Sequence, residues 1–246
     1  KYYFFNPKLL QSTTGSPTEL TTSDSIVSPL DSPRMIAFTD CCDCDDTAFN
    51  STIPPLPDTA IQCEGLKEIR IELEHQATDY VDSIYCRFRQ HLTTLSLDAM
   101  GNIVVQKLLE RGDLPRRLEI CENLSPHLAA LSCHKNGTWV VQKFIALASN
   151  SSDSRDLRHL LMSSLQPHLV SLLKDQFGNY VVQGCLGLGQ CARVLLECLR
   201  WRGVDLAKTR FGARAMKSLL EPTSTRHYDH RYYRHIVEGL LEKMDE

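Results

Sequence analysis

A ten-residue motif occurs four times in this chain, and its spacing constrains the fold more than any other feature. The copies begin at an aligned polar residue, namely Asp98, His134, Asp175 and Thr209. The fourth position of every copy is a glycine: Gly101, Gly137, Gly178 and Gly212. These glycines are 36, 41 and 34 residues apart. Because self-similarity at a period of about 20 to 50 residues is the signature of repeat architectures, the spacing predicts a solenoid.

Helical periodicity accompanies the motif. Apolar residues recur every three or four positions before the third copy, at Leu160, Leu161, Leu165, Leu169 and Leu172. This pattern predicts one helix that leads to a short turn and then to a second helix starting at the motif. No segment alternates long enough to indicate a strand. We therefore predict an all-α fold, an α-solenoid of stacked helix pairs.

Composition divides the chain in two. Residues 11–57 are rich in Ser, Thr, Asp and Pro without periodicity, so residues 1–62 are predicted to be a disordered acidic linker. Residues 63–246 are predicted to be the repeat domain, with clear repeats around 85–222 and degenerate or capping helices at both ends, the first over 63–95. The chain carries a net charge of −3, but residues 1–65 hold 3 basic and 9 acidic residues, whereas residues 66–246 hold 24 and 21. The repeat domain is therefore mildly basic.

Other classes of protein are disfavoured. No apolar stretch approaches the roughly 18 residues of a membrane span, and no signal peptide is visible. Three Ser-Pro dipeptides, at Ser16, Ser28 and Ser32, are either phosphorylation sites or incidental features of a linker. Seven cysteines are spaced singly and are predicted to be buried thiols of an intracellular protein: Cys63, Cys86, Cys121, Cys133, Cys185, Cys191 and Cys198.

The residue spacings indicate neither a metal site in the cysteine cluster nor a catalytic site. The group Cys41-Cys42-Asp43-Cys44 lacks a second Cys/His pair at zinc-site spacing, so no metal is expected there. The segment 226–235, rich in Arg and Tyr and holding His227, His230 and His235, fits a metal, contact with a nucleic acid or a solvated helix or loop. No nucleophile has a matched base at recognisable spacing. We therefore expect no enzymatic activity, no catalytic residue and no cofactor.

The second helix of each of the first three copies presents a polar pair. With about 100° per residue, Asn102 and Gln106 share one face, while Val104, Val105 and Leu108 lie on the other. The same geometry pairs Thr138 with Gln142 and Asn179 with Gln183, beside the flat or apolar side chains Ile103, Trp139 and Tyr180.

Two interpretations of these pairs stay open. Amides offer both a donor and an acceptor to a base edge, and aromatic rings stack on bases. Alternatively, Asn and Gln cap the helices while Trp and Tyr pack in the core. Because packing needs no amide at one fixed position of consecutive repeats, the repetition favours single-stranded RNA read at one base per repeat.

The motif Phe177-Gly-Asn-Tyr-Val-Val-Gln183 and its copies resemble the Pumilio (PUF) family of RNA-binding repeat proteins. The variants at 134–139 and 211–217 are most similar to a fungal branch in which an RNA-recognition motif precedes six PUF repeats. Because its first residue is Lys rather than Met, the chain is expected to be a fragment. No RNA-recognition motif is visible in residues 1–60.

The resemblance implies a role for each aligned residue. The pairs Asn102/Gln106 and Asn179/Gln183 would each bind the edge of a uracil, and Thr138/Gln142 would bind the edge of an adenine. With the RNA running antiparallel to the repeats, the three pairs would recognise 5′-U-A-U-3′. Bases would stack on Ile103, Trp139, Tyr180 and Arg214. The RNA backbone would contact Lys107, Lys143 and Lys217. Ala213 and Lys217 depart from any base-reading pair.

The resemblance also implies a biological role. We expect a cytoplasmic protein that binds U/A-rich elements in mRNA 3′ untranslated regions and controls mRNA stability, translation or localisation, with mRNA-decay or translation-repression proteins as further partners. The alternative is a helical-repeat scaffold for protein segments, favoured by the weak net charge, by Ile103 at a stacking position and by the lost pair at Ala213 and Lys217. The sequence predicts no oligomeric state.

Overall fold

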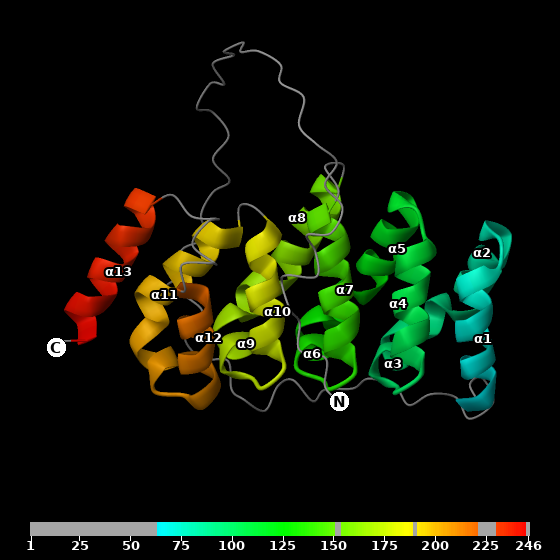
Figure 1. Cartoon of the computed structure of the whole chain (residues 1–246), viewed down its shortest axis with the longest axis horizontal. Helices are drawn as coiled ribbons and strands as arrows, with labels where there is room; N and C mark the ends of the chain where they lie inside the picture. Colours follow the sequence, from blue (N-terminus) through cyan, green and yellow to red (C-terminus); the bar gives the residue numbers. More distant parts are fainter. Residues whose placement is uncertain (1–62, 151–153, 189–190, 221–229, 245–246) are drawn as a thin grey trace, which may run out of the picture. The chain divides into compact units, whose positions relative to one another are not determined.

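The computed structural model describes residues 63–150, 154–188, 191–220 and 230–244, and in this part of the chain the secondary structure is helical throughout (Figure 1). The contact pattern separates residues 1–42 from residues 43–246, and every described helix belongs to the second unit. The predicted linker over 1–62, with its Ser-Pro dipeptides and Cys41–Cys44, lies outside the described residues. The all-α prediction is confirmed.

Four successive repeats each pair a first segment with a second helix. The first segments are α2 (Thr78–Phe88) with α3 (Leu92–Leu97), α5 (Leu114–Leu124) with α6 (Leu128–Ser132), α8 (Arg155–Leu165) with α9 (Leu169–Lys174), and α11 (Cys191–Ala207). The second helices are α4 (Gly101–Arg111), α7 (Gly137–Asn150), α10 (Gly178–Gly184), extended by the 3₁₀ turn η7 (Cys185–Leu188), and α12 (Arg210–Leu220). Each second helix begins within its copy of the motif, as predicted.

The first segments of three repeats are not continuous helices. They are broken by the 3₁₀ turns η4 (Arg89–His91), η5 (Ser125–His127) and η6 (Gln166–His168). The prediction of one helix through residues 160–172 is therefore wrong. In η5 and η6 the turn holds Pro126 and Pro167, which have no N–H group to continue the helical hydrogen bonds.

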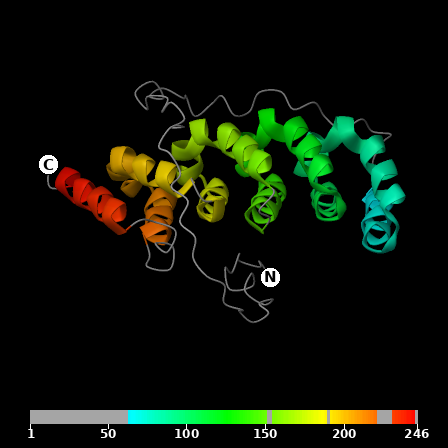
Figure 2. The same cartoon turned by 90° about the horizontal axis from the view of Figure 1, so that it is seen from above.

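The second helices pack side by side in chain order, α4 on α7, α7 on α10 and α10 on α12 (Figures 1 and 2). We call these four helices the second-helix row. The first segments pack in a separate row, with α5 against α8 and α9 against α11. Aligned motif residues are thereby placed on neighbouring helices.

Additional helices lie at both ends of the described array. Residues 78–97 form a full first segment, so only α1 (Cys63–His75) remains of the degenerate unit predicted over 63–95. It packs on α4. At the other end α13 (His230–Met244) packs on α11, where the buried Leu240 lies against Gly203.

One continuous apolar cluster runs from Leu66 on α1 to Leu240 on α13. The single cysteines contribute to it unevenly. Cys121, Cys185 and Cys198 are buried as predicted, and Cys133 is half-buried. The prediction was wrong for Cys86, which is exposed because it lies on the outward face of α2.

Arginines join the C-terminal ends of helices to the next element. The guanidinium of Arg117 donates to the carbonyl oxygens of Leu109 and Glu110 at the end of α4, at 2.9 and 3.2 Å. At the equivalent position of the next repeat, Arg158 donates to the carbonyl oxygen of Ala148 near the end of α7, at 3.0 Å. Because the last carbonyls of a helix lack partners within it, these bonds fix the pairing of successive repeats.

Candidate nucleic-acid interface

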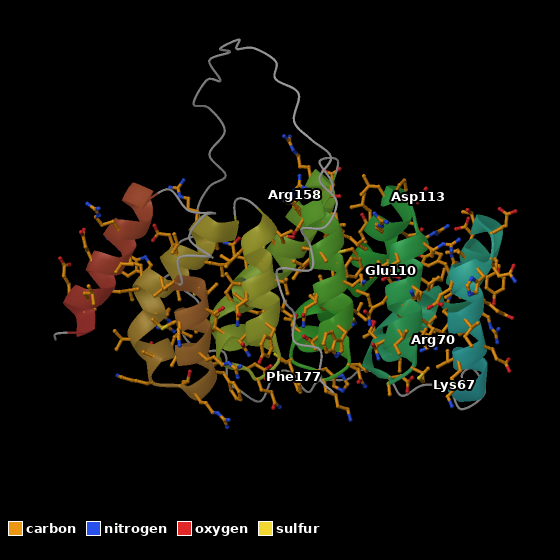
Figure 3. The ribbon with its side chains drawn as sticks, in the orientation of Figure 1. Lys67, Arg70, Glu110, Asp113, Arg158 and Phe177 are labelled. Atoms are coloured by element: carbon orange, nitrogen blue, oxygen red, sulfur yellow. The ribbon has the colours of Figure 1, made fainter. Side chains whose placement is uncertain are left out.

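The first residue of each motif fixes the start of the second helix. One carboxylate oxygen of Asp175 accepts hydrogen bonds from the backbone N–H groups of Phe177 and Gly178, both at 2.7 Å (Figure 3 labels Phe177 in this turn). Asp98 does the same at the start of α4, and the Thr209 hydroxyl accepts from Gly212. These acceptors satisfy N–H groups that have no partner within the helix.

His134 occupies this position in the second copy. Its Nδ1 accepts from the backbone N–H groups of Asn136 and Gly137 at 3.2 and 3.4 Å. Burial and then the charge of Lys135 lower the pKa of His134 below its ordinary value. The neutral ring that can accept at Nδ1 is therefore favoured.

The motif glycine is required by a close approach between the two parts of a repeat. A Cβ atom at Gly178 would lie 2.9 Å from the carbonyl oxygen of Leu172, and one at Gly137 would lie 2.7 Å from that of Leu131. Both distances are well inside van der Waals contact, so only glycine allows the second helix to start against the first segment.

On α4 the Asn side chain is tied to the preceding turn. Asn102 is 5% exposed, and its Nδ2 donates to the carbonyl oxygens of Asp98 and Ala99 at 2.8 and 2.9 Å. Its Oδ1 accepts from Nε2 of Gln106 at 2.9 Å. Both amide hydrogens of Asn102 are used, so its oxygen faces the glutamine.

The same arrangement recurs on α10. Asn179 is 1% exposed, and its Nδ2 donates to the carbonyl oxygens of Asp175 and Gln176 at 2.8 and 3.0 Å. Its Oδ1 accepts from Nε2 of Gln183 at 3.0 Å. Neither Asn caps its helix as the alternative predicted, because each side-chain amide donates to turn carbonyls and each Oδ1 accepts from the neighbouring Gln.

On α7 a hydroxyl replaces the Asn amide. Thr138 is 3% exposed, and its Oγ1 accepts from Nε2 of Gln142 at 3.0 Å. Among the described residues nothing else pairs with the amides of Gln142 or Gln106, so each keeps one N–H and its oxygen for a ligand. Gln183 differs, because its Oε1 accepts from Ser218 Oγ of the next repeat at 2.9 Å.

The predicted stacking residues lie at aligned positions of the row. Trp139 is 40% exposed, which is unusual for a large aromatic side chain, while Ile103 and Tyr180 are half-buried. The guanidinium carbon of the exposed Arg214 lies 6.0 Å from the centre of the Tyr180 ring. Tyr180 and Arg214, on successive helices, are thus neighbours in the row.

Two of the predicted backbone-contacting lysines are paired with carboxylates. Lys143 Nζ lies 2.6 Å from Glu110 Oε1, and Lys107 Nζ lies 3.0 Å from Glu110 Oε2 and 3.4 Å from Glu74 (Figure 3 labels Glu110). Burial alone would raise the pKa of Glu110, but hydrogen bonds and charges from Lys143 and Lys107 together lower it below its ordinary value. The positive charge of these two lysines is therefore balanced within the protein.

The fourth copy presents different chemistry. Ala213 and Lys217 stand where the other copies have their polar pair, and both are exposed on α12. Sequence reasoning noted this departure but missed Glu110 and the capping role of the first motif residue. The i, i+3 spacing of Lys107 and Glu110 was the available signal for the role of Glu110.

Other site types are absent from the part of the chain that the structure describes. It contains no cluster of three His, Cys, Asp or Glu side chains able to hold a metal, and no helix combining the length and apolar character of a membrane span. The side chains of His227, His230 and His235, considered above for RNA contact, lie outside the described residues.

Comparison with known families and proteins finds matches to the repeats. A model of the Pumilio-family RNA binding repeat matches residues 91–125, 127–152 and 168–191, which contain the three polar pairs. The Pumilio domain-containing protein P35G2.14 of Schizosaccharomyces pombe is 33% identical over 72% of this chain. The mRNA-binding protein PUF2 of Saccharomyces cerevisiae is 31% identical over 71% of it. The chain spans only 17% and 16% of the length of these relatives.

Solved structures show the same architecture. The PUM-HD domain of S. pombe Puf1 in complex with RNA superposes with a TM-score of 0.65 at 31% identity, covering 77% of this chain and 49% of that one. A Puf4 variant bound to a Cox17 RNA 3′ UTR recognition sequence gives 0.65 at 25% identity, covering 74% and 54%. The solenoid prediction is thereby confirmed.

Proposed function

Because this chain belongs to the Pumilio family of RNA-binding repeat proteins, we propose that its second-helix row binds single-stranded RNA in a sequence-specific manner, at one base per repeat. The matched relatives include one named as an mRNA-binding protein, and the matched structures include RNA complexes. We extend the proposal to U/A-rich elements of mRNA 3′ untranslated regions and to post-transcriptional control in the cytoplasm, with decay or translation-repression proteins as partners.

The observation that carries the proposal is the orientation of the glutamines. Backbone carbonyls hold the Asn amide, and the Asn oxygen then holds the N–H of Gln106 or Gln183. A glutamine held in this way presents an N–H donor beside an oxygen acceptor, and the oxygen of Gln183 keeps its second lone pair beside the bond from Ser218. Uracil offers the complementary acceptor and donor on its Watson–Crick edge, whereas cytosine offers an acceptor where uracil has its ring N–H. Uracil is therefore preferred at these two repeats.

The middle repeat supports a different base. Thr138 replaces the Asn amide with a hydroxyl that can both donate and accept, and Trp139 offers a large exposed ring for stacking. We assign adenine to Thr138/Gln142, so that three repeats read U-A-U. The role of Asn102 and Asn179 is to position the glutamines, while Gln106, Gln142 and Gln183 contact the bases.

Single glutamine substitutions test this assignment. Gln183→Ala should abolish the preference for U over C at one end of U-A-U and keep it at the other end, because one amide contact contributes about 1 kcal/mol. Gln106→Ala should do the reverse. Fluorescence anisotropy with short labelled RNAs measures both preferences, and circular dichroism checks that helicity is unchanged.

The same binding experiment distinguishes RNA binding from the scaffold alternative. A protein-binding scaffold would give no RNA complex even at low salt, where phosphate contacts are strongest. If RNA binds but neither substitution changes a base preference, the polar pairs are structural and the reading assignment is wrong.

A further inference from the structure

The fourth second helix carries three cations on one face. Arg210, Arg214 and Lys217 follow one another at i, i+4 and i+7 on α12, and at 100° per residue they fall within about 60° of one another. All three are exposed. We call this group the cationic stripe.

The positive charges of the cationic stripe have no carboxylate partner among the described residues, whereas Lys107 and Lys143 have one. Among the described residues no carboxylate lies within ion-pair distance of Arg210, Arg214 or Lys217. By contrast, Lys107 and Lys143 share Glu110. The difference extends beyond these side chains, because residues 191–220 contain seven basic and two acidic residues. The mild basic character of the repeat domain is thus concentrated in its fourth repeat.

The stripe adjoins the third reading site. Arg214 lies over the Tyr180 ring, and Ser218, next to Lys217, donates to Gln183 at 2.9 Å. An RNA strand that follows the row beyond a base held on α10 would therefore meet α12 next.

The chemistry of α12 suits a phosphate better than a base edge. Ala213 has no polar group, and Arg and Lys side chains donate hydrogen bonds but accept none. The Watson–Crick edges of uracil, adenine, cytosine and guanine each include a donor that such a set leaves unpaired. Phosphate oxygens are acceptors only and carry the opposite charge.

We propose that the cationic stripe binds backbone phosphates next to the nucleotide held on α10, irrespective of the base that they carry. This inference rests on the proposed RNA binding and adds a sequence-independent anchor to the three reading repeats. Affinity is then divided between base contacts on α4, α7 and α10 and charge neutralisation on α12.

The salt dependence of binding measures the anchor. The double variant Arg210→Gln/Lys217→Gln of the full chain should reduce the slope of log affinity against log salt by about 0.7 per lost contact. Arg155→Gln, an exposed cation on the first-segment row, should leave the slope unchanged. A second measurement uses the wild-type protein and therefore does not depend on how a variant folds. It compares U-A-U RNAs whose flanks have either charged phosphodiester linkages or uncharged methylphosphonate linkages.

The possible outcomes separate the two proposals. Lower affinity for RNA with an uncharged flank on one side of U-A-U, together with a reduced slope for the double variant, supports the anchor. If wild-type protein reads U-A-U but neither flank charge nor the double substitution changes binding, the anchor alone is refuted. If flank base identity changes affinity more than flank charge does, α12 reads a base and the inference is again wrong. Absence of any RNA complex refutes the proposed function itself.

Discussion

The ammonium group of Lys143 on α7 lies 2.6 Å from a carboxylate oxygen of Glu110 on α4. Glu110 also pairs with Lys107 of its own helix at 3.0 Å, so one carboxylate serves two successive repeats. Glu110 is therefore the partner of both lysines that the family resemblance assigns to the RNA backbone.

Replacing Glu110 with Gln should strengthen RNA binding, because two lysines lose their partner and a repelling charge leaves the interface. We expect a severalfold gain in affinity at low salt and a slope against log salt that is steeper by up to about 0.7 per freed lysine. Titrations at several salt concentrations measure both quantities. Glu119→Gln on α5, outside the second-helix row, is the control, and an unchanged slope in Glu110→Gln would contradict the prediction.

Glu110 should also contribute to acid sensitivity. Its pKa is lowered in the folded protein, so its contribution to the free energy of unfolding is present above its unfolded pKa of 4.5 and is lost as pH falls through the lowered value. The difference in stability between wild type and Glu110→Gln should therefore shrink as pH falls below 4.5. Urea denaturation at a series of pH values measures it, and a constant difference would show that Glu110 is not charge-stabilised.

His134→Asp should remove a different pH dependence. Because the folded pKa of His134 lies below its unfolded value of 6.5, the cap on α7 is intact above that pH and weakens as pH falls through the folded value. An Asp at this position, as in Asp98 and Asp175, keeps its acceptor charge to lower pH. The variant should gain about 1 kcal/mol over wild type between neutral pH and pH 5. Urea denaturation of both proteins at the two pH values measures the free energy of unfolding. If the difference between variant and wild type is the same at both pH values, His134 does not cap α7.

Gly178→Ala tests the close approach within a repeat. Its Cβ would meet the backbone carbonyl oxygen of Leu172 at 2.9 Å, which cannot move aside as a side chain can, so we expect a loss of about 1–3 kcal/mol. Gly65→Ala on α1 is the matched control, because nothing lies within 4 Å of its Cβ and the helix gains up to about 1 kcal/mol. Thermal unfolding of both variants should shift in opposite directions.

Trp139 should report RNA binding directly. The chain has two tryptophans, and Trp201 lies on α11 with Lys243 Nζ 4.4 Å from its ring centre. RNA should quench fluorescence in wild type and in Trp201→Phe, but much less in Trp139→Phe. Trp139→Ala should cost about 1–3 kcal/mol of binding without lowering the thermal midpoint, since the side chain is 40% exposed. Equal quenching in both Phe variants would place the stacked base elsewhere.

Much of this architecture follows from the sequence, because a motif repeated in register predicts helix pairs, their order and the shared position of the Gln residues. The burial of Asn102 and Asn179 does not follow, since Asn suits a turn carbonyl and a base edge equally well. The ion pair of Lys143 with Glu110 joins residues 33 positions apart, so it required the stacking of α4 on α7 to be known. The breaks at η5 and η6 were signalled by Pro126 and Pro167.

The hydrogen bonds that run from the turn carbonyls through Asn179 to Gln183 are made within one helix and its preceding turn, so folding alone forms them. A long polar side chain that is free in solution must give up rotamer entropy on binding, at about 0.5–1.5 kcal/mol each. Here that cost is incurred during folding. The side chains that we propose read bases are thus preorganised, so even a short array should keep more of its contact energy as affinity.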